Sequence, residues 1–263
     1  MELIAQGFPI FLLIFCRMTA FFVVAPLFSM RGVPTTFKIG LGFFLTLIVF
    51  LTYGVKESIV PDATYILFVI REVLVGLLLG FVVYLFFTVV QTAGALMDIS
   101  MGFAMSNVVD PMTGASSPML GNLKYMILVL VFLSMNGHHY MLTALMDSYK
   151  WMPLDNDLFA RIYSGKVSEF IVLAFSETFM LAFQIASPII VAMFLTDVGL
   201  GFLAKTAPQY NVFVIGMPLK ILIGVFMLTL ILPSMSGVFE HLFSTMFEHL
   251  QQLLTMLQRK EAS

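Results

Sequence analysis

The chain has 263 residues, of which 60% are hydrophobic and 11% charged, and its formal net charge is −2. A soluble domain carries about 25% charged and about 45–50% apolar residues, so this chain has too few polar side chains to coat a water-soluble globule. The composition predicts a polytopic membrane protein. It excludes a soluble enzyme, a disordered tail and a disulfide-stapled secreted module. A net charge near zero gives no electrostatic reason to expect a nucleic-acid partner.

Long apolar segments recur along the chain, at 8–29, 37–53, 66–90, 123–146, 170–196 and 212–232. Each is close to the ~20 residues that a helix needs to cross ~30 Å of hydrocarbon. Strands are not expected, because alternation is absent and an open sheet edge has no hydrogen-bond partners in lipid. The sequence therefore predicts an all-α membrane protein with five to seven apolar helices.

Prolines and charges interrupt these helices. Each proline removes a backbone donor and is expected to kink or end its helix, at Pro9, Pro26, Pro188 and Pro218. Charged side chains within apolar runs are costly and should face protein or water. For Arg71, Glu72 and Lys220, near helix ends, we expect the side chains to snorkel. For Arg17 and Glu177, nearer mid-span, we expect buried pairing, with partners that the sequence does not identify.

The lysines and arginines of the short loops do not favour either orientation in the membrane, because their totals on alternating sides are nearly equal. Clear hydropathy without a clear topology indicates either an unusual insertion route or a chain embedded in a complex.

The stretch 238–258 has the i, i+3, i+4, i+7 apolar spacing of an amphipathic helix. Its polar face holds acidic, histidine and glutamine residues, whereas a helix on anionic lipid presents Lys and Arg. This composition favours packing against partner helices.

A polar stretch at 91–121, rich in Gly, Pro and small polar residues, separates two long apolar runs. Asp110-Pro111 and Thr113-Gly114 are turn signals. A loop at membrane depth is possible only where protein buries it or it lines an aqueous cavity. Its methionines would suit a soft pore closure. By composition alone, an ordinary external loop is the simpler interpretation.

A second polar stretch, Asn136-Gly137-His138-His139, has no cysteine or carboxylate at metal-ligand spacing. We interpret it as capping or packing at a helix boundary. The sequence predicts no metal site and no cofactor.

Several motifs occur together in order and resemble the FliR/SpaR/EscT family of flagellar and type III secretion export-gate proteins. They are Gln91-x-Ala-Gly94 with Asp98, Met101-Gly-Phe103, Asp110-Pro111 with Gly114, Pro118-x-x-Gly121, Asn136-Gly-His-His139, Ala207-Pro208, Asn211-Val-Phe213 and Ile215-Gly-x-Pro-Leu-Lys-Ile221. The resemblance runs from residue 1 to about residue 258. It implies one domain over 1–263, with a FliP-like part at approximately 1–200 and a FliQ-like C-terminal hairpin at 201–263.

The resemblance also implies a function and partners. Family members are non-enzymatic, channel-forming subunits that assemble with FliP and FliQ in the bacterial inner membrane, at the flagellar basal body. Their kinked and broken helical hairpins pack into a helical multi-subunit export gate that passes unfolded flagellar proteins. FlhB wraps the closed gate, FlhA provides the cytosolic platform, and membrane lipid contacts the assembly.

In the family, the loop that matches residues 106–122 is a plug in the central channel. The resemblance therefore assigns a gating role to Ser106, Asn107, Asp110, Pro111, Met112, Gly114, Pro118, Met119 and Gly121. Four charged residues are expected to be buried polar or structural groups: Arg17, Asp98, Glu177 and Lys220.

Two other functions stay open at this point. A secondary transporter of a small solute would explain broken helices and intramembrane charge, and would depend on Asp98 or Glu177. An intramembrane protease is the weakest alternative, because the sequence has no His-Glu-x-x-His or Gly-x-Ser-x-Gly motif. Asp98 and Asp110 are the only conceivable acid pair, and Pro111 favours a turn at Asp110.

Overall fold

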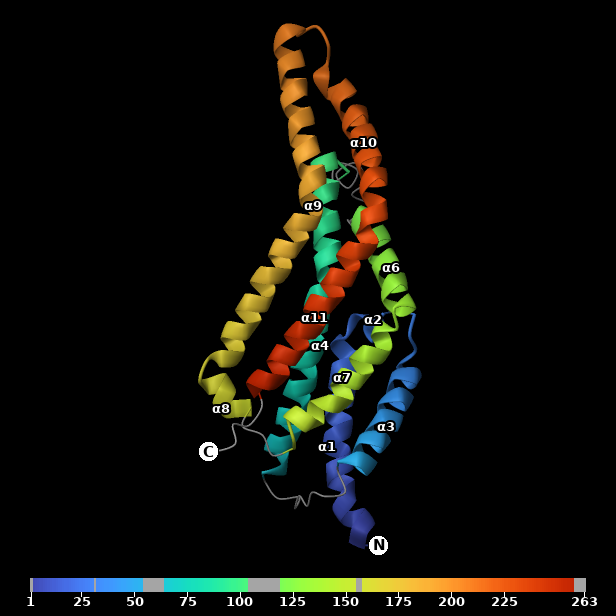
Figure 1. The fold of residues 1–263 in the computed structure, drawn as a ribbon, viewed down its shortest axis with the longest axis vertical. Coiled ribbons are helices and arrows are strands. Elements are labelled where there is room, and N and C mark those ends of the chain that lie inside the picture. Colours follow the sequence, from blue (N-terminus) through green and yellow to red (C-terminus); the bar gives the residue numbers. More distant parts are fainter. Residues whose placement is uncertain (1, 31, 54–63, 104–118, 155–157, 258–263) are drawn as a thin grey trace, which may run out of the picture. The chain divides into compact units, whose positions relative to one another are not determined.

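The computed structural model describes residues 2–30, 32–53, 64–103, 119–154 and 158–257, and over these residues every regular element is a helix (Figure 1). The predicted all-α class is confirmed. In chain order the elements are α1 (Glu2–Val24), α2 (Pro26–Ser29), α3 (Thr35–Thr52), α4 (Tyr65–Met101), α6 (Met119–Ser134), α7 (Gly137–Trp151), α8 (Leu158–Tyr163), α9 (Lys166–Thr206), α10 (Val212–Ile231), the 3-10 turn η2 (Leu232–Ser234) and α11 (Met235–Leu257).

The described residues contain five helical segments that are long and apolar enough to cross a membrane. They are Gly7–Val24, Thr35–Thr52, Tyr65–Met101, Lys166–Thr206 and Val212–Leu257. The pair α6 and α7, bent by 71°, makes a sixth if it is one broken span. The apolar run 123–146 therefore forms two helices that meet at Asn136. The helix breaks because Asn136 has a φ of 55°, the left-handed conformation that no helix interior can accommodate.

The prolines differ in their effects. α1 ends at Val24, Ala25 is extended, and Pro26 begins α2, where its missing N–H is not needed. Pro9, Pro188 and Pro218 lie inside α1, α9 and α10, which run on through them. Of the four prolines, only Pro26 lies at a helix boundary.

The chain forms two compact units. Unit 1 comprises Met1–Leu85, Leu133–Ala174 and Ser244–Ser263, and unit 2 comprises Phe86–Phe132 and Phe175–Phe243. Helices α4, α6, α9 and α11 each contribute residues to both units. The two units do not test the division expected near residue 200, between a FliP-like part and a FliQ-like hairpin. That division stays a prediction.

In unit 1, α1 packs against α3 and α4. The Phe11 ring contacts the rings of Phe43 and Phe50 on α3, at centroid distances of 5.5 and 6.0 Å. Gly76 and Gly80, four residues apart on α4, face the α1 backbone, so that an added Cβ at Gly76 would overlap the Arg17 carbonyl oxygen. Small residues at this spacing let two helices approach closely, which is a common way to join helices in a membrane.

In unit 2, an aromatic cluster joins α4, α6 and α11. The rings of Phe87, Phe132 and Phe243 lie 4.9–6.2 Å apart, and the three side chains are buried. Edge-on and tilted arrangements at these distances add about 0.5–1.5 kcal/mol per pair beyond the area that they bury.

The amphipathic helix predicted at 238–258 is confirmed as α11 (Met235–Leu257). Its apolar face is buried within this chain, at Phe239, Leu242, Phe243, Met246, Leu250, Leu253, Leu254 and Leu257. The helices that cover this face are therefore the chain's own.

Candidate functional site

Most residues of the predicted plug lie outside the described residues: Ser106, Asn107, Asp110, Pro111, Met112, Gly114 and Pro118. Met119 is the first residue of α6, and Gly121 lies in its first turn. The structure therefore describes the two helix ends from which this segment leaves and to which it returns.

The first end is the C-terminus of α4, and it closes with a hydrogen-bond pattern that stops a helix sharply. Gly102 has a φ of 88°, its N–H donates to the Ile99 carbonyl at 3.2 Å, and the Phe103 N–H donates to the Asp98 carbonyl at 2.9 Å. This is the Schellman arrangement, which needs a residue that tolerates positive φ.

The second end is the N-terminus of α6, and Asp98 caps it from α4. The Asp98 side chain is 5% exposed, and its two carboxylate oxygens accept the Leu120 N–H at 3.2 and 3.3 Å. The first N–H groups of a helix have no partner within it and attract negative charge. A carboxylate from another helix supplies that partner here.

Lys124 lies one turn further along α6 and is 2% exposed. Its Nζ donates to the Met97 sulfur at 2.7 Å and is attracted electrostatically by Asp98. A buried cation next to a buried anion reduces the cost of removing both charges from water.

Two close approaches complete this region. A Cβ at Gly94 would overlap the backbone of Gly121, so α4 and α6 touch main chain to main chain. The Met101 side chain, 1% exposed, packs against Gly224 on α10, where a Cβ would collide with it. We call the residues at these contacts the loop anchor: Gly94, Met97, Asp98, Met101, Leu120, Gly121 and Lys124.

Three anchor residues are named by no sequence motif: Met97, Leu120 and Lys124. Lys124 lies inside the apolar run 123–146, and a lysine within a predicted span is itself a signal of a buried partner. Asp98 was expected to be a buried polar group. It is buried on α4, and its side chain binds the first turn of α6.

Unit 1 holds a second buried polar cluster, centred on Arg17. Arg17 is fully buried, and it binds Glu72 through two nitrogens, with Nε–Oε2 at 2.7 Å and Nη2–Oε1 at 2.9 Å. Such two-pronged contacts are strong and geometrically specific. The partner of Arg17 is thus Glu72 on α4. The snorkelling predicted for Glu72 is wrong, because its side chain is completely buried.

The other donors of Arg17 bind α7 and the residue that follows it. Nη1 donates to Ser148 Oγ and Nη2 to the Met152 carbonyl, both at 3.0 Å, and the Tyr149 ring lies 3.8 Å from the guanidinium carbon. Arg17 therefore ties α1, α4 and the end of α7 together. These contacts are structural, since all of these groups are buried.

The remaining charged residues have different environments. Glu177 is exposed on α9, so the burial predicted for it is wrong. Lys220, 20% exposed, pairs with Asp197 at 2.6 Å. Arg71 is 5% exposed and lies over the Phe68 ring at 4.7 Å, so the snorkelling predicted for it is wrong.

The Asn136 stretch lies at a helix boundary, as predicted. The Asn136 carbonyl accepts the N–H groups of His139 at 2.9 Å and Tyr140 at 3.3 Å, which starts α7.

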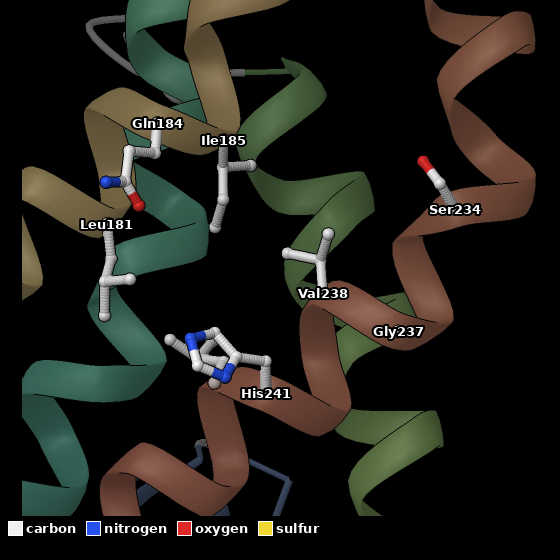
Figure 2. Close-up of a pocket in the computed structure, with 8 residues that line it drawn as sticks. Leu181, Gln184, Ile185, Ser234, Gly237, Val238 and His241 are labelled. Atoms are coloured by element: carbon white, nitrogen blue, oxygen red, sulfur yellow. The ribbon is translucent and has the colours of Figure 1, made fainter.

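Unit 2 also contains a pocket of about 400 Å³ between α9 and the η2–α11 segment (Figure 2). Three polar side chains line the pocket, from Gln184, Ser234 and His241. The other lining residues are Leu181, Ile185, Gly237, Val238 and Leu242. The Ser234 hydroxyl is used locally, since it donates to the Ile231 carbonyl at 2.7 Å. The lining contains no carboxylate or cysteine.

Comparison with known proteins identifies the family. Residues 8–246 match the family described as bacterial export proteins, family 1. The chain is 40% identical over 257 residues to the flagellar biosynthetic protein FliR of Bacillus subtilis (strain 168), covering 98% of this chain and 99% of that protein. It is 29% identical over 243 residues to FliR of Escherichia coli (strain K12), covering 92% and 91%. It is also 30% identical over 221 residues to the Yop proteins translocation protein T of Yersinia pestis, covering 83% and 84%.

These matches favour protein export over the solute-transporter and protease alternatives, and the family is one of export proteins rather than enzymes. Together with the candidate membrane spans, they make the chain an inner-membrane component of the flagellar and type III secretion export apparatus. The chain belongs to the FliR family of bacterial export proteins.

Proposed function

We propose that this chain is a channel-forming subunit of the flagellar type III export gate, which assembles with FliP and FliQ and passes unfolded flagellar proteins across the inner membrane. The observation that carries the proposal is the 40% identity to a flagellar FliR along nearly the whole chain. FlhB and FlhA are the further partners that we propose, in the roles that the family resemblance implies.

The exposed surface of α9 supports assembly with protein partners. Apolar side chains are exposed on α9 from Val172 to Leu203, which corresponds to a rise of about 47 Å at ~1.5 Å per residue. The hydrocarbon core is only ~30 Å thick. Even at a tilt of about 40°, this stretch of helix would span about 36 Å. Part of this face therefore needs a cover other than lipid.

Glu177 supports the same conclusion. It is exposed on α9, and Phe175 and Phe179 on the same helix are 58% and 56% exposed. An ionised carboxylate facing hydrocarbon is costly, so this part of α9 suits a protein neighbour or an aqueous channel.

We further propose that the segment 106–122 is the plug of the channel, and that the C-terminal hairpin from residue 201 resembles FliQ. The plug proposal is supported by the position of the segment between two helix ends that contact each other through Asp98 and Leu120. A plug whose two ends start from neighbouring helix ends could block the channel and still leave it when an export substrate arrives.

Deleting residues 110–118 is expected to leave the export complex assembled and to raise its ion leakage by several-fold. The physical reason is that the deletion removes the obstruction without touching the helices that bind neighbours. The measurement is the conductance of the complex, co-purified with its FliP and FliQ partners and reconstituted into lipid bilayers. Replacing 110–118 by a glycine–serine linker of equal length tests whether the native side chains are needed.

The matched control is Asp147→Asn, which alters an exposed ion pair with Lys150 on α7 and should leave conductance unchanged. An assembled complex that conducts no more after the deletion than before it would contradict the plug. Failure of FliP and FliQ to co-purify with the full chain would contradict the assembly itself.

A further inference from the structure

We propose that the pocket between α9 and the η2–α11 segment binds one membrane phospholipid, whose headgroup carries an ammonium group. The pocket has a volume of about 400 Å³, within the ~300–1,000 Å³ of ordinary ligand sites. All of its lining residues belong to unit 2. Lipid binding at this place involves neither the segment 106–122 nor the export function.

Both walls of the pocket belong to segments that are able to cross a membrane. The α9 wall lies in the candidate span Lys166–Thr206, and the η2–α11 wall lies in the candidate span Val212–Leu257. Lipid is the medium around a membrane span, so a phospholipid is the amphiphile with the readiest access to a pocket between two such segments.

The inner part of the pocket suits an acyl chain. Its side chains are apolar and are buried or half-buried, from Leu181, Ile185, Val238 and Leu242. In Figure 2 the side chains of Ile185 and Val238 extend into the space between the two helices. Ser234, the first lining residue of η2–α11, directly follows α10, whose exposed side chains include Leu222, Phe226 and Leu230. An acyl chain that leaves the pocket on this side therefore continues along apolar surface.

The other side of the pocket is polar. His241 lies seven positions after Ser234, about 10 Å further along the segment at ~1.5 Å per residue. Over Met235–Leu257, every exposed residue of α11 is polar or glycine. The surface of unit 2 thus changes from apolar on α10 to polar on α11, and the pocket lies at this change. A phospholipid has the same change of polarity along its length.

Charge selects the kind of headgroup. Two exposed carboxylates share helix faces with lining residues, since Glu177 lies four positions before Leu181 and Glu240 three positions after Gly237. The lining residues include no Lys or Arg that would attract a net negative headgroup. Gln184 and His241 carry N–H groups that can donate to a phosphate, and the carboxylates attract an ammonium group. A zwitterionic, ethanolamine-type headgroup meets both conditions.

The test is photocrosslinking in vesicles. The protein, purified with whatever subunits accompany it, is reconstituted into phosphatidylethanolamine and phosphatidylglycerol with a trace of a probe lipid that has a diazirine in its acyl chain. Three probes with the same chain are compared: a phosphatidylethanolamine, a phosphatidylglycerol and a free fatty acid. We expect adducts within 181–185 and 234–242, several-fold more from the phosphatidylethanolamine probe. Equal yields from all three probes, as any lipid-facing surface gives, would overturn the proposal.

Gly237→Leu tests the pocket itself. A Cβ at Gly237 meets no atom within 4 Å, so the new side chain fills open space without displacing a neighbour. Adducts from the phosphatidylethanolamine probe should fall several-fold. Gly199→Leu is the matched control, because a Cβ there also meets nothing within 4 Å and Gly199 does not line the pocket. An undiminished yield from Gly237→Leu would refute binding in the pocket.

The glutamates test the headgroup. Glu177→Gln combined with Glu240→Gln should abolish the preference for the phosphatidylethanolamine probe over the phosphatidylglycerol probe and leave the fatty-acid yield unchanged. Glu248→Gln is the control, since Glu248 is exposed on α11 but does not line the pocket or lie within a turn of a lining residue. A preference that survives the double substitution rules out recognition of the ammonium group. Should Gly237→Leu fail to accumulate in membranes, these variants decide alone.

A protein neighbour is the competing occupant of the pocket. Adducts in the chain alone that disappear in the complex with its partners would show that a neighbouring subunit fills the pocket, and would overturn lipid binding. The export function is tested separately, by co-purification and conductance. Failure of FliP and FliQ to co-purify leaves the adduct measurement intact, so each proposal can fail without the other.

Discussion

Replacing Arg17 by methionine is expected to destabilise the chain by about 3–5 kcal/mol, the usual cost of leaving one partner of a buried ion pair without the other. Glu72 is fully buried and has Arg17 at 2.7 and 2.9 Å, so the substitution strands its carboxylate in the interior. The same change removes the donors to Ser148 and Met152. The measurement is the unfolding temperature of the detergent-solubilised chain, together with its steady-state amount in membranes.

Two further variants show whether the charge or the packing is responsible. Arg17→Met with Glu72→Met removes both charges and should recover much of the lost stability, because no ion is left buried. Asp147→Asn is the control, since its pair with Lys150 is exposed and should leave the unfolding temperature unchanged. A wild-type unfolding temperature for Arg17→Met alone would refute a structural role for the pair.

Gly76→Val is expected to be the second most damaging change. A side chain at Gly76 would overlap the Arg17 carbonyl oxygen and approach the Ala20 Cβ to 2.9 Å. Backbone cannot retreat as a flexible side chain can, so α1 and α4 must separate. Overpacking of this kind costs about 1–3 kcal/mol, and a shift of α1 would also stretch the Arg17–Glu72 contact. The unfolding temperature is again the readout.

Gly199→Ala provides the matched control, because a Cβ there meets nothing within 4 Å. It should leave stability unchanged or raise it slightly, since alanine favours a helix over glycine by ~1 kcal/mol. The combination Gly76→Val with Arg17→Met should cost less than the sum of the two, because both act on one contact between α1 and α4. A loss from Gly76→Val no larger than that from Gly199→Ala would contradict the close approach of α1 and α4 as its cause.

The sequence was sufficient to predict the helices but not their partners. Apolar runs of about 20 residues identify the spans, because the bilayer sets their length. The partner of Arg17 could not be found in this way, since Glu72 lies 55 positions away and Ser148 lies 131 positions away. A hydropathy pattern describes one helix at a time and says nothing about which helices meet.

Glu72 and Glu177 show the same limit. Both are glutamates in apolar helices, yet Glu72 is fully buried on α4 and Glu177 is exposed on α9. Which side of a helix faces protein depends on the neighbours that surround it. α4 is covered by α1 in unit 1 and by α6 in unit 2, whereas much of α9 is exposed.

The motifs predicted the residues of the candidate site, but not the contacts between the helix ends on either side of it. The plug residues come from the family resemblance, and all but Met119 and Gly121 lie outside the described residues. Asp98 was marked as a polar group in an apolar setting, but its partner is the backbone N–H of Leu120. A main-chain group carries no residue-type signature, so only the three-dimensional structure reveals the contact.

The left-handed Asn136 between α6 and α7 has a consequence for genetic variation. Glycine adopts a φ of 55° freely, asparagine and aspartate tolerate it, and β-branched residues are strained there. Selection is therefore expected to act differently on different substitutions at position 136. Single-base changes of an asparagine codon to isoleucine or threonine should be removed by selection, whereas the change to aspartate should persist. One backbone dihedral angle thus determines which substitutions the gene can retain at this position.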